Sequence, residues 1–167
     1  MSATMSKRPY TGIWPVAPTP FNADGSLDLE GMKRVLDLMI DQGVDGICIL
    51  ANFSEQFLLS DEEREVLTRL CLEHVAGRVP VIVTISHFAT QIVEARARLA
   101  ASLGASMLMM MPPYHGTGLR ADEVSVIEHF RAAGKAGGIP IMLQDAPLSG
   151  VQLTVGQIVR MAREVPE

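Results

Sequence analysis

Five short apolar runs alternate with amphipathic stretches along the 167-residue chain. The runs lie at residues 13–18, 46–51, 80–85, 106–112 and 140–146. Each run is almost continuously apolar, a pattern typical of parallel strands that are buried on both faces. They begin roughly every 26 to 34 residues, about the length of one strand, one helix and two loops. This repeat predicts an α/β fold made of consecutive β/α units.

The stretches between the runs predict helices. Apolar residues recur with a helical period between Met32 and Ile40. Ser60 precedes three acidic residues, which is typical of a helix N-terminus because the helix dipole favours negative charge there. The expected helices cover residues 29–42, 60–75, 90–103, 121–136 and 154–163.

The loop after the first predicted strand separates two α/β architectures. Residues 17–21 read Ala-Pro-Thr-Pro-Phe, and two prolines cannot offer the amide donors of a glycine-rich dinucleotide site. A (β/α)₈ TIM barrel is therefore favoured, with its active site at the carboxyl ends of the strands. The chain is predicted to be its first five β/α units and to end before strand six, since a barrel needs about 250 residues. Residues 1–10 are expected to be a flexible tail and residues 11–167 a partial barrel domain.

Composition excludes several functional classes. The net charge is −5 and the basic run is only Lys7-Arg8, so no nucleic-acid partner is expected. No apolar stretch reaches the roughly 18 residues of a membrane span, and the N-terminus lacks the apolar core of a signal peptide. Cys48 and Cys71 do not form a metal-binding spacing, and buried free thiols are expected. The prediction is a soluble protein of a reducing compartment, the cytoplasm, without a metal site.

Polar residues follow four of the predicted strands. The second strand is followed by residues 52–55, Asn-Phe-Ser-Glu, and the third by His87. Tyr114 and His115 follow the fourth strand, and Gln144 follows the fifth. Each has a structural alternative: a helix-entry loop, a packed tyrosine or a structural histidine. Because the carboxyl ends of barrel strands share one face, we expect these groups to gather there. By contrast, His74 and His129 are expected on solvated helix faces.

The order of several motifs resembles the dihydrodipicolinate synthase / N-acetylneuraminate lyase family. The motifs are Thr19-Pro20-Phe21, the segment ending in Glu55, Leu59-Ser60 followed by Glu63-Arg64, Pro112-Pro113-Tyr114, and the prolines 140 and 147. The similarity covers residues 11–167. It implies a (β/α)₈ barrel, usually tetrameric, that binds a 2-keto acid as a Schiff base on a lysine and needs no metal or organic cofactor.

Departures from the family pattern point to one branch of it. Residues 51–55 stand where Gly-Thr-Thr-Gly-Glu is usual, and His115 replaces the second residue of a Tyr-Tyr pair. Gln144 replaces the tyrosine that relays protons, and an amide cannot donate and accept protons as a phenol does. Together with His87, these residues resemble the L-2-keto-3-deoxyarabonate dehydratase branch. That resemblance implies removal of water from a 2-keto-3-deoxy sugar acid.

The resemblance also implies roles for the strand-end residues. Asn52, Phe53 (through its backbone) and Ser54 are expected to bind the substrate carboxylate and imine region, with His87 as a further binding residue. The expected catalytic residues are Tyr114, His115 and Gln144; His115 and Gln144 would orient sugar hydroxyls or a water. Glu55 is expected to be a structural hydrogen-bonding residue.

The three lysines, Lys7, Lys33 and Lys135, are not at a predicted strand end. In the family the Schiff-base lysine lies on the sixth strand, so the nucleophile is expected to be absent from this segment. The favoured function is a hydro-lyase acting on a small-molecule 2-keto acid, in a homo-oligomer. Two alternatives stay open: a 2-keto acid aldolase of the same family, or a non-catalytic barrel fragment that self-associates.

Overall fold

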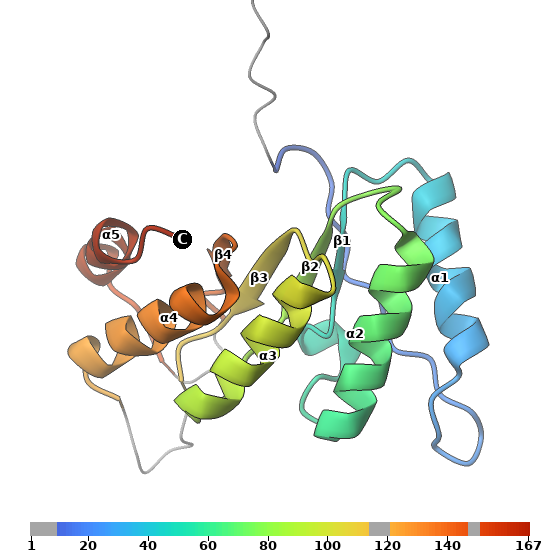
Figure 1. Ribbon diagram of the computed structural model, residues 1–167, viewed down its shortest axis with the longest axis horizontal. Coiled ribbons are helices and arrows are strands. Elements are labelled where there is room, and N and C mark those ends of the chain that lie inside the picture. The colour runs from blue at the N-terminus through green and yellow to red at the C-terminus, as the bar shows by residue number, and fades with distance from the viewer. Residues whose placement is uncertain (1–9, 114–120, 147–150) are drawn as a thin grey trace, which may run out of the picture.

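A parallel sheet flanked by helices forms the centre of the computed structural model, which describes residues 10–113, 121–146 and 151–167 (Figure 1). Its strands are β1 (Ile47–Ile49), β2 (Val81–Thr84), β3 (Met107–Met110) and β4 (Ile141–Leu143), and they are adjacent in chain order. All three strand pairs are parallel. This order is the one that successive β/α units produce, and it confirms the α/β class predicted from the sequence.

The first predicted strand, residues 13–18, lies beside β1 but forms only one bridge, between Val16 and Cys48. The Ala17 N–H donates to the Cys48 carbonyl at 2.8 Å, and the Cys48 N–H donates to the Pro15 carbonyl at 2.9 Å. Pro15 and Pro18 have no N–H to donate. The prediction of a full strand here was therefore too long, although the segment occupies the first-strand position.

Five α-helices follow the predicted ranges within one or two residues at each end. They are α1 (Leu29–Asp41), α2 (Asp61–Val75), α3 (Thr90–Ser102), α4 (Glu123–Gly137) and α5 (Val155–Glu164). Side-chain caps explain several of the starts. The Ser60 hydroxyl accepts from the Glu63 N–H while the Glu63 carboxylate accepts from the Ser60 N–H, which satisfies two otherwise unpaired donors.

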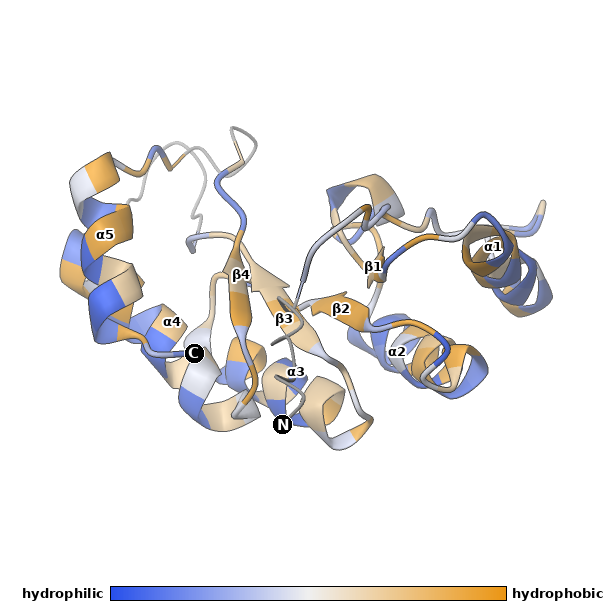
Figure 2. Ribbon diagram, turned by 90° about the horizontal axis from the view of Figure 1, so that it is seen from above, coloured by the Kyte–Doolittle hydropathy of each residue, from blue (hydrophilic) through white to orange (hydrophobic). Residues whose placement is uncertain are grey.

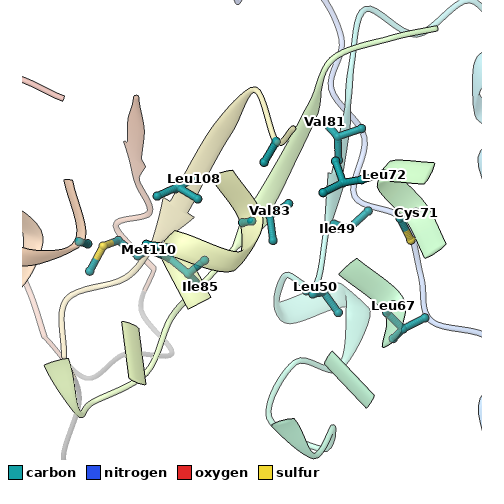
Figure 3. Packing of buried hydrophobic residues seen from close by; sticks show 14 of the residues in the cluster. Ile49, Leu50, Leu67, Cys71, Leu72, Val81, Val83, Ile85, Leu108 and Met110 are labelled. Atoms are coloured by element: carbon teal, nitrogen blue, oxygen red, sulfur yellow. The ribbon is translucent and has the colours of Figure 1, made fainter. Parts of the chain in front are cut away.

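Both faces of the sheet are apolar, and each forms its own cluster. Val81, Val83 and Ile85 pack with helix residues such as Leu67 and Cys71 in the larger cluster (Figure 3). The smaller cluster on the opposite face contains Cys48, Ala51, Ile82, Met107 and Met109. Seen from above, the strands are hydrophobic along their length and the helices are mixed (Figure 2). Burial on both faces explains the continuous apolar runs of β1 to β3.

β4, the last strand of the sheet, is more exposed to solvent than β1 to β3. Met142 in β4 is 39% exposed, and only β3 pairs with β4 among the named strands. The Ile141 N–H donates to the Glu167 carbonyl at 2.9 Å, so the last residues of the chain lie beside the start of β4.

Two expectations about single residues have different outcomes. Cys48 and Cys71 are buried free thiols, as predicted, and burial raises their pKa to about 11 and about 12. The expected solvated face is wrong for His129, which is buried with its Nδ1 2.9 Å from the Thr90 hydroxyl. No helix among the described residues has the length and apolar character needed to cross a membrane.

Candidate active site

The short 3₁₀ helix η1 (Asn52–Ser54) follows β1 at the carboxyl edge of the sheet. Ser54 is buried, and its hydroxyl donates to the Ala17 carbonyl at 2.6 Å and accepts from the Ala51 N–H at 3.1 Å. Its own carbonyl accepts from the Thr19 hydroxyl at 2.8 Å. Ser54 therefore fastens η1 to the extended segment at residues 17–19, which lies beside β1.

Asn52 reaches from η1, which follows β1, to the carboxyl end of β3, two strands away in the sheet. Its side-chain nitrogen donates to the Met111 sulfur at 3.7 Å, just past β3, and its side-chain oxygen accepts from Gln56 Nε2 at 2.5 Å. By contrast, the Phe53 side chain is 72% exposed, so the backbone is the part of Phe53 held by this turn. The predicted binding segment is thus one fixed turn in which Asn52 is the polar side chain tied to β3.

His87 lies three residues beyond Thr84, the last residue of β2, and its ring stacks on Phe88 with the ring centres 4.3 Å apart. Its Nδ1 accepts from the Ala89 N–H at 2.9 Å, so in the neutral ring Nε2 carries the proton. Burial lowers the pKa of His87, and the positive charge of Arg96 lowers it further, while Asp61 opposes both. Asp61 and Arg96 belong to α2 and α3, so His87 lies on the helix side of the strand end. Because its pKa is lowered, its ring is a neutral donor.

Gln144 directly follows β4, and its N–H donates to the Met110 carbonyl at 2.9 Å. Its side-chain oxygen is buried and has no hydrogen-bond partner within the described residues. The structure therefore brings Asn52, through its side chain, and Gln144, through its backbone N–H, to the same strand end, that of β3. An acceptor left unpaired in this place suits a ligand that has hydroxyl groups.

Other predicted residues are placed differently or fall elsewhere. Tyr114 and His115 lie outside the described residues. Glu55 is exposed with a backbone φ of 59°, and no side-chain hydrogen bond of Glu55 occurs in the described part of the chain, contrary to the structural role expected for it. Lys33 pairs with Glu30 on α1, and Lys135 is exposed in the last turn of α4, so neither is at a strand end.

Two arginines behind the edge were not predicted to have a role. Arg64 is buried and donates to the Gln56 carbonyl at 3.2 Å and to the Thr84 carbonyl at 2.6 Å. Arg96 donates to the Ser86 carbonyl and to Asp61, each at 2.6 Å, and this bond lowers the pKa of Asp61. The motif at Ser60 to Arg64 contains the first arginine, but helical periodicity alone does not distinguish these arginines from exposed ones.

Arg64 and Arg96 also border a cavity of about 330 Å³ between α2 and α3, on the helix side of β2. This cavity is not at the edge that carries Asn52 and Gln144. Within the ranges that the structure describes, no group of three or more His, Cys, Asp or Glu side chains could hold a metal ion. The polar groups of the edge are thus amide and hydroxyl groups together with the imidazole of His87.

The family model of the "Dihydrodipicolinate synthetase family" matches residues 9–167. The chain belongs to the dihydrodipicolinate synthetase family. Among its relatives is an L-2-keto-3-deoxyarabonate dehydratase of Azospirillum brasilense, 55% identical over 98% of this chain and 53% of that protein. A 4-hydroxy-tetrahydrodipicolinate synthase of Stenotrophomonas maltophilia is 35% identical over 82% of this chain and 45% of that protein.

Solved structures of the dihydrodipicolinate synthetase family have the same fold. YagE of Escherichia coli K12, a prophage protein of this family in complex with pyruvate, superposes with a TM-score of 0.88 at 30% identity. The match covers 94% of this chain and 52% of YagE. The chain thus spans about half the length of the relatives it matches, as expected for part of a TIM barrel.

Proposed function

We propose that this chain is part of a hydro-lyase that dehydrates a 2-keto-3-deoxy sugar acid, with L-2-keto-3-deoxyarabonate as the substrate. The observation that carries the proposal is the 55% identity to the Azospirillum brasilense dehydratase over 98% of the chain. The identity to the tetrahydrodipicolinate synthase of Stenotrophomonas maltophilia is 20 percentage points lower (55 − 35) over a shorter span.

The proposed reaction uses a lysine amine that is not among the strand-end residues of this chain. The amine condenses with the C2 ketone and releases water, and the resulting iminium withdraws electrons and makes the C3 proton acidic. A base takes that proton, and the electron pair forms the C3–C4 double bond as the C4 hydroxyl leaves. A general acid protonates the leaving hydroxyl, so one water is lost. Hydrolysis of the imine then frees the product and the lysine.

The residues at the sheet edge suit binding and orientation in this scheme. The Asn52 amide and the backbone N–H of Phe53 are proposed as donors to the substrate carboxylate. The N–H and the hydroxyl of Ser54 already donate to the Ala51 and Ala17 carbonyls, so Ser54 is proposed to hold the binding turn in place and not to donate to the substrate. Gln144 offers an unpaired acceptor for a sugar hydroxyl, and His87 offers an Nε2–H. Tyr114 and His115 are proposed as the further catalytic groups. In this reading, replacement of the usual relay tyrosine by Gln144 favours dehydration over aldol cleavage.

The complete protein is proposed to be a cytoplasmic homo-oligomer. Large apolar side chains are exposed on the loops after β1 and β2: Phe53 (72%), Phe57 (49%), Leu58 (75%) and Phe88 (50%). Exposed apolar residues grouped on adjacent loops commonly form a protein interface, and a second copy of the chain would cover them.

The assay that tests the function uses the complete protein, comprising this chain and the remaining strands. It is incubated with L-2-keto-3-deoxyarabonate, and products are followed by NMR. Loss of one water without carbon–carbon cleavage is the expected result. Release of pyruvate and an aldehyde would instead support the aldolase alternative.

A further inference from the structure

Gln56 is almost completely buried, with 4% of its surface exposed, and its main chain is fixed on two sides. Its N–H donates to the Ala51 carbonyl at 3.3 Å, and its carbonyl accepts from Arg64. Arg64 donates in turn to Thr84 at the end of β2. These hydrogen bonds fix the position of the Gln56 backbone relative to the end of β2, so its side chain starts from a fixed point.

The side chain of Gln56 determines which way the Asn52 amide faces. A thioether sulfur can accept a hydrogen bond but has no hydrogen to donate. Met111 therefore requires the nitrogen of Asn52, which lies 3.7 Å from its sulfur. The Asn52 oxygen must then face a donor, and Gln56 Nε2 supplies it at 2.5 Å.

The opposite arrangement would satisfy one more group inside the protein but would create a worse contact. If Asn52 donated to Gln56, the Gln56 oxygen, which has no partner among the described residues, would gain one. The Asn52 oxygen would then face the Met111 sulfur, so that two acceptors would meet. The observed orientation leaves the second N–H of Asn52 for a further acceptor, because an amide nitrogen has two hydrogens.

We propose that Gln56 is a positioning residue that holds the Asn52 amide with its nitrogen toward the end of β3, where the N–H that does not face Met111 binds the carboxylate of the substrate. This inference rests on the proposed function and identifies the polarity of the site: Asn52 donates there and does not accept. A carboxylate has only acceptors when ionised, so it matches this orientation, and a hydrogen bond to a charged group is among the stronger ones.

The substitution Gln56→Glu reverses the polarity with almost no change in shape. An ionised carboxylate can only accept, so Asn52 would turn its nitrogen toward it and direct its oxygen at the substrate carboxylate. In the complete protein we expect KM for the 2-keto-3-deoxy acid to rise roughly tenfold or more, the effect of losing a hydrogen bond to a charged group. The value of kcat should change much less, because the contact is made in both ground and transition states.

The pH profile separates positioning from damage to the fold. Burial raises the pKa of a carboxyl group, and the protonated form can donate its O–H to the Asn52 oxygen as Gln56 does. The increase in KM for Gln56→Glu should therefore be small at low pH and grow as the pH rises. Gln56→Met, which removes the donor without adding an acceptor, should raise KM less and independently of pH. Gln91→Glu adds the same charge at an exposed position of α3 and should leave KM unchanged.

A double-mutant cycle completes the test. Once Asn52→Ala has removed the amide, Gln56→Glu should have little further effect on KM, whereas independent effects would add. Additive effects, or an unchanged KM for both Gln56→Glu and Gln56→Met, would overturn the role of Gln56. If Gln56→Glu does not fold, the cycle is made with Gln56→Met. A wild-type protein without dehydratase activity would overturn the proposed function itself, and the two failures are therefore distinguishable.

Discussion

The hydroxyl of Ser54 is a small group with two buried partners, the Ala17 carbonyl and the Ala51 N–H. Ser54→Ala would leave both without their partner. We expect a loss of about 1–3 kcal/mol in the free energy of unfolding, the usual cost of unsatisfied buried groups. Ser102→Ala, at an exposed position of α3, should change it by less than about 0.5 kcal/mol. Urea denaturation of the complete protein measures both, and equal effects would contradict the role given to Ser54.

His87 should make stability depend on pH just below its ordinary pKa of 6.5. Burial lowers the pKa of the folded state, so between the two values the unfolded chain binds more protons. Stability therefore rises with pH through that window and levels off above about 6.5. His87→Gln should reduce this slope in urea denaturation between about pH 5 and 7.5. If the slope is unchanged in the variant, another group causes it.

The sequence locates the residues of the strand ends but not the groups that hold them. Asn52, Ser54 and Gln144 could be predicted because polar residues directly follow apolar runs, and parallel strands end at one edge. Gln56, Arg64 and the burial of His129 could not. Each lies in a polar or mixed stretch, and whether such a side chain is buried depends on the neighbouring helices and strands rather than on local periodicity.

At the scale of the elements, Arg64 connects three of them, since it lies on α2 and binds the loop after η1 and the end of β2. Arg64→Met keeps the aliphatic packing but leaves the Gln56 and Thr84 carbonyls without this donor. We expect a loss of about 1–3 kcal/mol in the free energy of unfolding. Arg69→Met removes an exposed ion pair with Glu65 on the same helix and should cost at most about 1 kcal/mol. Denaturation curves with equal midpoints would contradict this assignment.

Helix and strand positions were predictable for a related physical reason. Caps and apolar periodicity are local properties, so the five helices begin and end close to the predicted residues. The first strand was predicted too long because apolar content does not show which backbone groups pair. Prolines at positions 15 and 18 remove donors on the edge of the sheet, and one bridge is what remains.

At the scale of the whole molecule, the position of the lysines determines what this 167-residue chain can do by itself. Of the three lysines, Lys33 and Lys135 are on helices, away from the carboxyl edge of the sheet, and Lys7 lies outside the described residues and is expected in the N-terminal tail. The isolated chain should therefore give no adduct when borohydride is added with pyruvate or a 2-keto-3-deoxy acid. Mass spectrometry reads out the result. A stable adduct on Lys33 or Lys135 would reveal a nucleophile that the fold does not suggest, whereas the complete protein should form one.

In the complete molecule, the choice between dehydration and aldol cleavage is expected to depend on Gln144 and His115. Gln144→Tyr replaces the amide oxygen, which is proposed to accept from a sugar hydroxyl, with a bulkier phenol, so dehydration should not improve. His115→Ala should lower kcat by roughly 10²-fold or more if His115 transfers a proton. It should instead raise mainly KM if His115 only positions the substrate. Steady-state kinetics of both variants, with product analysis by NMR, distinguishes these roles. Faster dehydration in Gln144→Tyr would show that a relay phenol is compatible with the reaction, and the substitution at position 144 would then no longer explain the preference for losing water.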